Sequence, residues 1–286
     1  MSIVEKAIDK LQSTQPSKPT HRPAKAGKGK RPRARTDANT LVIDEERLQA
    51  AGVLPPKEQR HRTDNEFRSI KRPILAHAFG KGGTSVPDGN LVMVASCLPG
   101  EGKTFAAINL ALSVAMERDR TVLVVDADIP KPRLKRIFDL EEARGLTDLL
   151  LDESLSVADV LVHTSIPNLK LIPSGQFHHH ATELLASERM EYVVREIGHR
   201  YPDRLVVFDS PPLLGTAEAQ VLAQLMGQIV LVVEADRTSQ RAVHDAMEML
   251  DGQGAVNLVL NKCRTSRSDY YASYYGDYQE KRDNEE

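Results

Sequence analysis

The chain of 286 residues carries 38 Lys and Arg, 40 Asp and Glu, and 41% hydrophobic residues, for a formal net charge of −2. That length and apolar content are enough for one large domain with extensions, or for two small domains, each with a packed core. Cys97 and Cys263 are the only cysteines, which excludes a disulfide-rich scaffold and suits a reducing cytoplasm. No apolar run approaches the roughly 20 residues of a membrane span, and the first residues lack the apolar stretch of a signal peptide.

The first 40 residues contain a short amphipathic segment and a basic one. Residues 1–12 place apolar side chains on one side of a helix too short to be stable alone, so we expect this helix to dock on a partner. Between Ser13 and Thr36 there are eight Lys or Arg, four Pro and no acidic residue. We predict a disordered basic linker over residues 13–40. A linker of this charge can touch anionic lipid or nucleic acid, but a solvated spacer is the simpler interpretation, and we expect no nucleic-acid partner.

A helical extension is predicted over residues 41–82. Leu41 to Leu54 has the pattern of a small helical segment that ends at Pro55-Pro56, and residues 65–72 form a charged helix carrying Phe67 and Ile70. Glycines at 80, 82 and 83 then predict a flexible join to the next domain.

Residues 83–264 have the pattern of an α/β domain, because short apolar runs alternate with helical patterns. The runs are continuous, as expected for strands of a mostly parallel sheet with helices on both faces. They lie at Leu91–Val94, Thr121–Val125, Leu169–Ile172, Leu205–Phe208, Ile229–Val233 and Val256–Leu260, and the helical patterns lie at 103–117, 181–199, 216–226 and 238–251.

A glycine turn between the first run and the first helical pattern has the character of a phosphate-binding loop, so the fold is predicted to be that of a P-loop NTPase. Gly100 and Gly102 allow the backbone to approach a ligand closely, Lys103 reaches the β- and γ-phosphates, and the Thr104 hydroxyl ligates Mg²⁺. The first glycine of the strict pattern is replaced by Cys97. The predicted nucleotide-binding residues of the loop are Pro99, Gly100, Glu101, Gly102, Lys103, Thr104 and Phe105.

Acidic residues follow two of the other predicted strands. Asp126 and Asp128 come after the run at 121–125, and Asp209 comes after the run at 205–208. Since ligands bind at the carboxyl ends of parallel strands, we expect these carboxylates to lie at the same edge of the sheet as the phosphate loop. There they can support Mg²⁺, and one of them can orient or deprotonate an attacking hydroxyl.

The C-terminal tail, residues 265–286, contains five of the seven tyrosines of the chain in polar and acidic surroundings. Little of such a segment can be buried, so we expect a flexible tail whose tyrosines serve as stacking surfaces or as phosphate acceptors. The tyrosines are Tyr270, Tyr271, Tyr274, Tyr275 and Tyr278.

Together these motifs resemble those of the bacterial tyrosine kinases that control exopolysaccharide synthesis, and most of all the tyrosine autokinases of exosortase-associated polysaccharide loci. Three motifs and the tyrosine cluster carry the resemblance, as do residues 1–7 and the segments at 173–175 and 183–187. The motifs are Ser96 to Thr104, Val124-Val125-Asp126-Ala127-Asp128 and Val206-Val207-Phe208-Asp209-Ser210-Pro211-Pro212.

The resemblance implies a role for each part of the site, with ATP and Mg²⁺ as cofactors. Lys103 and Thr104 would hold nucleotide and metal, Asp126 would be the base for the tyrosine hydroxyl, and Asp128 and Asp209 would support the metal. Asn261, after the last strand, would face the adenine.

The resemblance also implies partners and a location. The tail tyrosines would be phosphorylated by a neighbouring subunit in a homo-oligomeric ring. The partner would be the cytoplasmic segment of a transmembrane chain-length-determinant protein. The chain itself would be cytoplasmic and peripheral at the inner face of the plasma membrane.

Departures from the family pattern keep alternatives open. Pro130 stands where the family often has Arg, and the Glu-x-x-Arg-x-x-Arg pattern of the oligomerisation helix, aligned on Arg68, meets Asn65 and Lys71. ATPases that position chromosomes or septa share the fold and the Asp motifs. They usually carry a second lysine where this chain has Leu98, and they lack a tyrosine tail. A non-enzymatic, nucleotide-gated adaptor is the third possibility.

Overall fold

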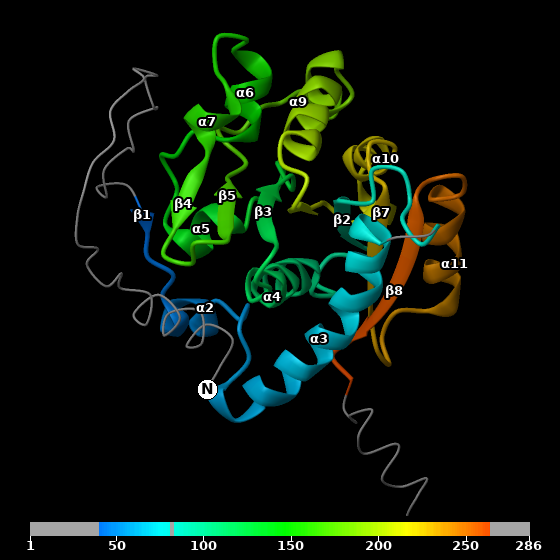
Figure 1. Ribbon diagram of the computed structural model, residues 1–286. Helices are drawn as coiled ribbons and strands as arrows, with labels where there is room; N and C mark the ends of the chain where they lie inside the picture. The colour runs from blue at the N-terminus through cyan, green and yellow to red at the C-terminus, as the bar shows by residue number, and fades with distance from the viewer. Residues whose placement is uncertain (1–39, 81–82, 264–286) are drawn as a thin grey trace, which may run out of the picture.

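The structure is a computed structural model that describes residues 40–80 and 83–263. Its eight-stranded sheet has the order β1-β4-β5-β3-β6-β2-β7-β8, and helices cover both faces (Figure 1). All neighbouring strands are parallel except β4 and β5. The strands are β1 (Thr40–Leu41), β2 (Leu91–Ser96), β3 (Thr121–Asp126), β4 (Val162–Thr164), β5 (Leu169–Ile172), β6 (Arg204–Asp209), β7 (Gln228–Glu234) and β8 (Ala255–Asn261).

The helices of the described ranges vary from one turn to six. They are α2 (Glu45–Ala50), α3 (Lys57–Phe79), α4 (Lys103–Ala115), α5 (Leu134–Phe138), α6 (Leu146–Leu151), α7 (Val157–Val160), α8 (Ala181–Leu185), α9 (Glu188–His199), α10 (Ala217–Ala223) and α11 (Gln240–Met249), with a 3-10 turn, η1, at Leu213–Gly215. Within these ranges, no helix combines the length and apolar character that crossing a membrane requires.

The predicted α/β sheet is confirmed, and all six predicted runs are strands. β2 and β6 are buried along their whole length, which explains why their sequences are continuously apolar rather than alternating. One hydrophobic core lies between the sheet and α2 to α5, and a second lies between the sheet and α6 to α11. β8 is one of the two edge strands, and from Asn257 onward its half-buried and exposed residues alternate.

Several short elements were not predicted from the sequence. β1 and β4, and the helices α5, α6 and α7, are too short to show a clear period. The single helical pattern over 181–199 is two helices, because Ser187 interrupts it and caps α9, its Oγ accepting the Met190 N–H at 3.2 Å.

The N-terminal extension packs onto the same core. α3 begins directly after Pro55-Pro56 and runs for 23 residues, so the predicted helix at 65–72 is only its middle. Phe67 and Ile74 of α3 are buried against α4. The Asn109 side chain of α4 donates to the Val53 carbonyl at 2.7 Å, which fixes the chain just before α3.

Candidate active site

The phosphate loop joins β2 to α4 through two glycines in the left-handed region. Gly100 has φ of 88° and Gly102 has φ of 103°, conformations that side chains with a Cβ rarely adopt. A Cβ on Gly102 would also lie 2.1 Å from the Asn261 side-chain nitrogen. α4 begins at Lys103, so the unpaired N–H groups of its first turn lie in the loop. This is the geometry that cradles phosphates.

Hydrogen bonds of the Glu101, Asn261 and Lys262 side chains hold the loop in place. The Glu101 carboxylate accepts the Leu98 N–H at 2.7 Å and the Thr238 hydroxyl, so this side chain braces the loop from inside. Asn261 donates its side-chain N–H to the Glu101 carbonyl at 2.8 Å. Lys262 donates to the Gly100 carbonyl at 2.7 Å. The end of β8 is therefore tied to two consecutive carbonyls of the loop.

The three predicted carboxylates converge beside this loop. Asp126 and Asp209 end the neighbouring strands β3 and β6 and are partners in the parallel register. Asp128 lies two residues beyond, and its carboxylate pairs with the Lys103 ammonium at 2.8 Å. All four side chains are buried. The register of two strands, which no local pattern reveals, places the carboxylates together.

Two of these carboxyl groups, Asp126 and Asp209, have a raised pKa. The pKa of Asp126 lies well above its ordinary value, first because the group is buried and then because Asp209 and Asp128 are close. Burial raises the pKa of Asp209 to about 6, although the Lys103 charge opposes the shift. A raised pKa makes a carboxylate a better proton acceptor, as a catalytic base must be.

The unsatisfied polar atoms of the site fit a hydrated magnesium ion. The Thr104 hydroxyl and both carboxylate oxygens of Asp209 are buried without a hydrogen bond of good geometry, although Thr104 is close enough to lower the pKa of Asp209. One oxygen of Asp126 is in the same state, while the other accepts the Leu134 N–H at 3.2 Å. Buried polar atoms are nearly always satisfied, and oxygen atoms are the ligands that Mg²⁺ prefers.

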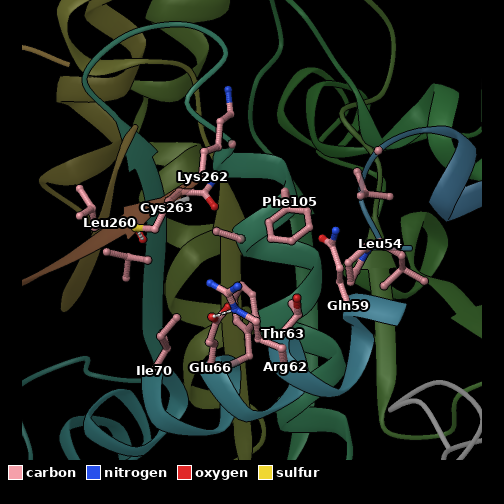
Figure 2. A pocket seen from close by; sticks show the side chains of 18 of the residues that line it. Leu54, Gln59, Arg62, Thr63, Glu66, Ile70, Phe105, Leu260, Lys262 and Cys263 are labelled. Atoms are coloured by element: carbon pink, nitrogen blue, oxygen red, sulfur yellow. Dashed lines mark hydrogen bonds and ion pairs between the residues drawn. The ribbon is translucent and has the colours of Figure 1, made fainter. Parts of the chain in front are cut away.

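A groove of about 1630 Å³ opens next to the loop, between α3 and the end of β8. Figure 2 shows Arg62 and Glu66 of α3 across from Lys262 and Cys263, with Phe105 of α4 to one side. Gly100, Gly102 and Asn261 also line this groove. Asn261, the residue predicted to face the adenine, lies next to this open groove. One N–H of its side chain is already used in the hydrogen bond to the loop.

The family model described as "AAA domain" matches residues 90–256. A tyrosine-protein kinase of Bacillus subtilis is 32% identical over 217 residues, which cover 75% of this chain and 83% of that protein. The chain belongs to the bacterial tyrosine-protein kinase family. The kinase domain of an Escherichia coli tyrosine kinase has a similar structure, with a TM-score of 0.60, 25% identity and coverage of 80% of this chain and 92% of that one.

The fold alone is shared more widely than this kinase family. A septum site-determining protein of Pyrococcus horikoshii, solved with Mg-ADP, has a TM-score of 0.50 at 22% identity, covering 62% of this chain and 71% of that one. Leu98, which stands where we expected a lysine in a positioning ATPase, has 41% of its surface exposed.

Sequence reasoning missed two residues that this member of the kinase family uses to hold its phosphate loop. Thr238 lies between β7 and α11, and Lys262 directly follows the predicted Asn261. The one feature of the sequence that could have indicated a role for Lys262 is its position next to Asn261 at the end of a strand. The predicted acceptor tyrosines, Tyr270 to Tyr278, lie outside the described residues, as do the docking helix at 1–12 and most of the linker.

Proposed function

We propose that this protein is an ATP-dependent protein-tyrosine autokinase that transfers the γ-phosphate to C-terminal tyrosines of neighbouring subunits and thereby regulates exopolysaccharide polymerisation and export. The observation that carries the proposal is that buried carboxyl groups with unsatisfied oxygens lie beside a phosphate loop. The chain just before the tyrosine tail, at the end of β8, is also hydrogen-bonded to that loop.

Each side chain has a defined task in this proposal. The loop N–H groups and Lys103 bind the β- and γ-phosphates, and Asp128 holds the Lys103 ammonium in place. Thr104, Asp209 and Asp128 would hold Mg²⁺, directly or through water, which would neutralise charge on the phosphates. Asp126, whose pKa is raised, accepts the proton of the tyrosine hydroxyl.

The exposed face of α3 is the proposed ring contact. A stripe at 60, 63, 67, 71 and 74 is buried, while Arg62, Glu66 and Arg68 are exposed. Lys71, the second basic position of the aligned family pattern, instead donates to the Ser113 carbonyl at 2.8 Å and pairs with Glu117. The ring contact therefore rests on Arg68 and its neighbours. A ring places each tail near the next active site at high effective concentration.

The proposal extends to the partner and the location. The activator is the cytoplasmic segment of a transmembrane chain-length-determinant protein, and residues 1–12, for which the sequence predicts a short helix, are the segment that docks on it. Through this contact the kinase is held at the inner face of the plasma membrane.

Peptide mass spectrometry after incubation with Mg-ATP tests the function, with and without the activator's cytoplasmic segment. We expect phosphate on residues between Tyr270 and Tyr278 in the wild type and none in Asp126→Asn, which should still bind nucleotide. Modification of Asp126→Asn at the wild-type rate would remove Asp126 as the base.

The same experiment separates the alternatives. ATP hydrolysis without tyrosine modification in either tube would favour a positioning ATPase, for which the shared fold is the supporting observation. Nucleotide binding with neither hydrolysis nor modification would favour a nucleotide-gated adaptor.

A further inference from the structure

A row of basic side chains lies on the sheet face that α9 covers, near the amino-terminal ends of the strands. His163 of β4 is the antiparallel partner of Lys170 of β5, and Lys170 is aligned with Leu123 of β3. Two residues earlier on β3, Thr121 is aligned with Arg204 of β6. Because aligned residues of neighbouring strands point to the same face, His163, Lys170 and Arg204 share one face.

Arg204 is the buried member of this row. Only 4% of its surface is exposed. Its Nε has no hydrogen-bond partner, although the Tyr201 side chain hydrogen-bonds to the guanidinium group. The guanidinium carbon lies 4.0 Å from the centre of the Tyr201 ring, which covers it on one side. A buried guanidinium ordinarily pairs with a carboxylate, because burial of a single charge is costly.

Counter-charge is scarce around the row. Within 40–80 and 83–263, no ion pair involves His163, Lys170 or Arg204. Asp203 is the nearby acid, and its carboxylate accepts the Thr121 hydroxyl at 3.2 Å. Burial lowers the pKa of Lys170, and repulsion from Arg204 lowers it further; burial and then repulsion from Lys170 lower the pKa of His163.

We propose that Arg204, Lys170 and His163 form a binding site for a phosphate-type oxyanion, separate from the nucleotide site. The forked guanidinium can donate two parallel hydrogen bonds to such a group, and the Lys170 ammonium adds a point charge. His163 is exposed and Lys170 is half-buried, so a ligand from solvent would enter the row at the end away from the buried Arg204. The inference does not depend on the proposed kinase activity, because no residue of the phosphate loop takes part.

Titration of the full chain with inorganic phosphate tests the site. The protein is saturated with Mg-ADP to block the phosphate loop, the ionic strength is held constant, and the Arg204 Nε–H signal is followed by NMR. We expect a saturable shift of this signal. Lys170→Gln should weaken phosphate binding about tenfold, because a charge-assisted hydrogen bond is lost. The matched control is Arg195→Gln, which removes an exposed cation of α9 that pairs with Glu191, and it should leave the affinity within about twofold.

The source of the anion is resolved in a second arm with vesicles of phosphatidylcholine containing phosphatidic acid. Weaker vesicle binding by Lys170→Gln than by Arg195→Gln would identify the ligand as a lipid headgroup. The basic linker could also bind anionic vesicles, but both variants keep it, so it cannot cause the difference. Equal vesicle binding together with the phosphate shift would identify a soluble phosphate. No saturable shift of the Arg204 signal, or an unchanged affinity in Lys170→Gln, would overturn the proposal. Lys170 is used rather than Arg204 because its side chain is half-buried, and its removal leaves the core intact.

Discussion

Lys262 donates a hydrogen bond from its ammonium to the Gly100 carbonyl at 2.7 Å and pairs with Glu234 at 3.0 Å. It has φ of 58°, so the chain turns sharply at the point where β8 ends. Through this contact, the segment that leads into the tyrosine tail is attached to the phosphate loop.

Lys262→Met should weaken ATP binding about tenfold, because the loop loses a charge-assisted hydrogen bond that fixes Gly100. Titration calorimetry with a non-hydrolysable ATP analogue measures the change. Arg237→Met is the control, since Arg237 pairs with the same Glu234 carboxylate, at 3.4 Å. Equal affinities for the two variants would show that Lys262 does not position the loop.

Asp209→Asn should stabilise the Mg²⁺-free protein by up to about 3 kcal/mol at pH 7, because the raised pKa of about 6 reports the cost of ionising this buried group. An acid with a raised pKa binds more protons in the folded state between its unfolded and folded values. Wild-type stability should therefore fall as the pH rises from about 4 to 6 and level off above that.

Urea unfolding at a series of pH values checks this expectation. Asp209→Asn should show a smaller decline than the wild type, and the exposed Asp251→Asn should show the wild-type profile. Identical stability profiles for Asp209→Asn and wild type would mean that the ionisation of Asp209 does not destabilise the folded protein.

Lys103→Met should abolish both ATP binding and tail modification, because the buried ammonium that reaches the phosphates is removed. It should also destabilise the fold by about 3 kcal/mol, since Asp128 is left buried without its partner. Adding Asp128→Asn should restore most of the stability without restoring ATP binding. Thermal unfolding and nucleotide titration of the single and double variants separate the two effects, and recovery of ATP binding in the double variant would contradict the role of Lys103.

Removal of residues 269–286 should leave ATP binding unchanged and abolish autophosphorylation. A full-length variant with all five tail tyrosines changed to Phe should behave in the same way, which separates the hydroxyl groups from tail length. Tyr192 and Tyr201 are exposed tyrosines of the kinase domain, and changing both to Phe should leave the phosphotyrosine signal intact. A strong phosphotyrosine signal in the truncated protein would remove the tail as the acceptor.

Local sequence patterns predicted the scaffold of the site. β2, the glycine turn and α4 follow from adjacent residues, because an apolar run, two glycines and a helical pattern each determine their own conformation. Asp126 and Asp209 could be assigned to the same edge, since carboxyl ends of parallel strands meet there. The sequence alone therefore determined the fold class, the phosphate loop and the edge that carries the acids.

Only the tertiary structure decided how distant segments meet. The alignment of Asp126 with Asp209, the attachment of Lys262 to Gly100 and the row that ends at Arg204 depend on strand register. The packing of α3 turned Lys71 inward and left Arg68 exposed. These relationships join residues tens of positions apart, and they arise from the packing of the whole sheet and its helices, which no pattern within a single segment encodes.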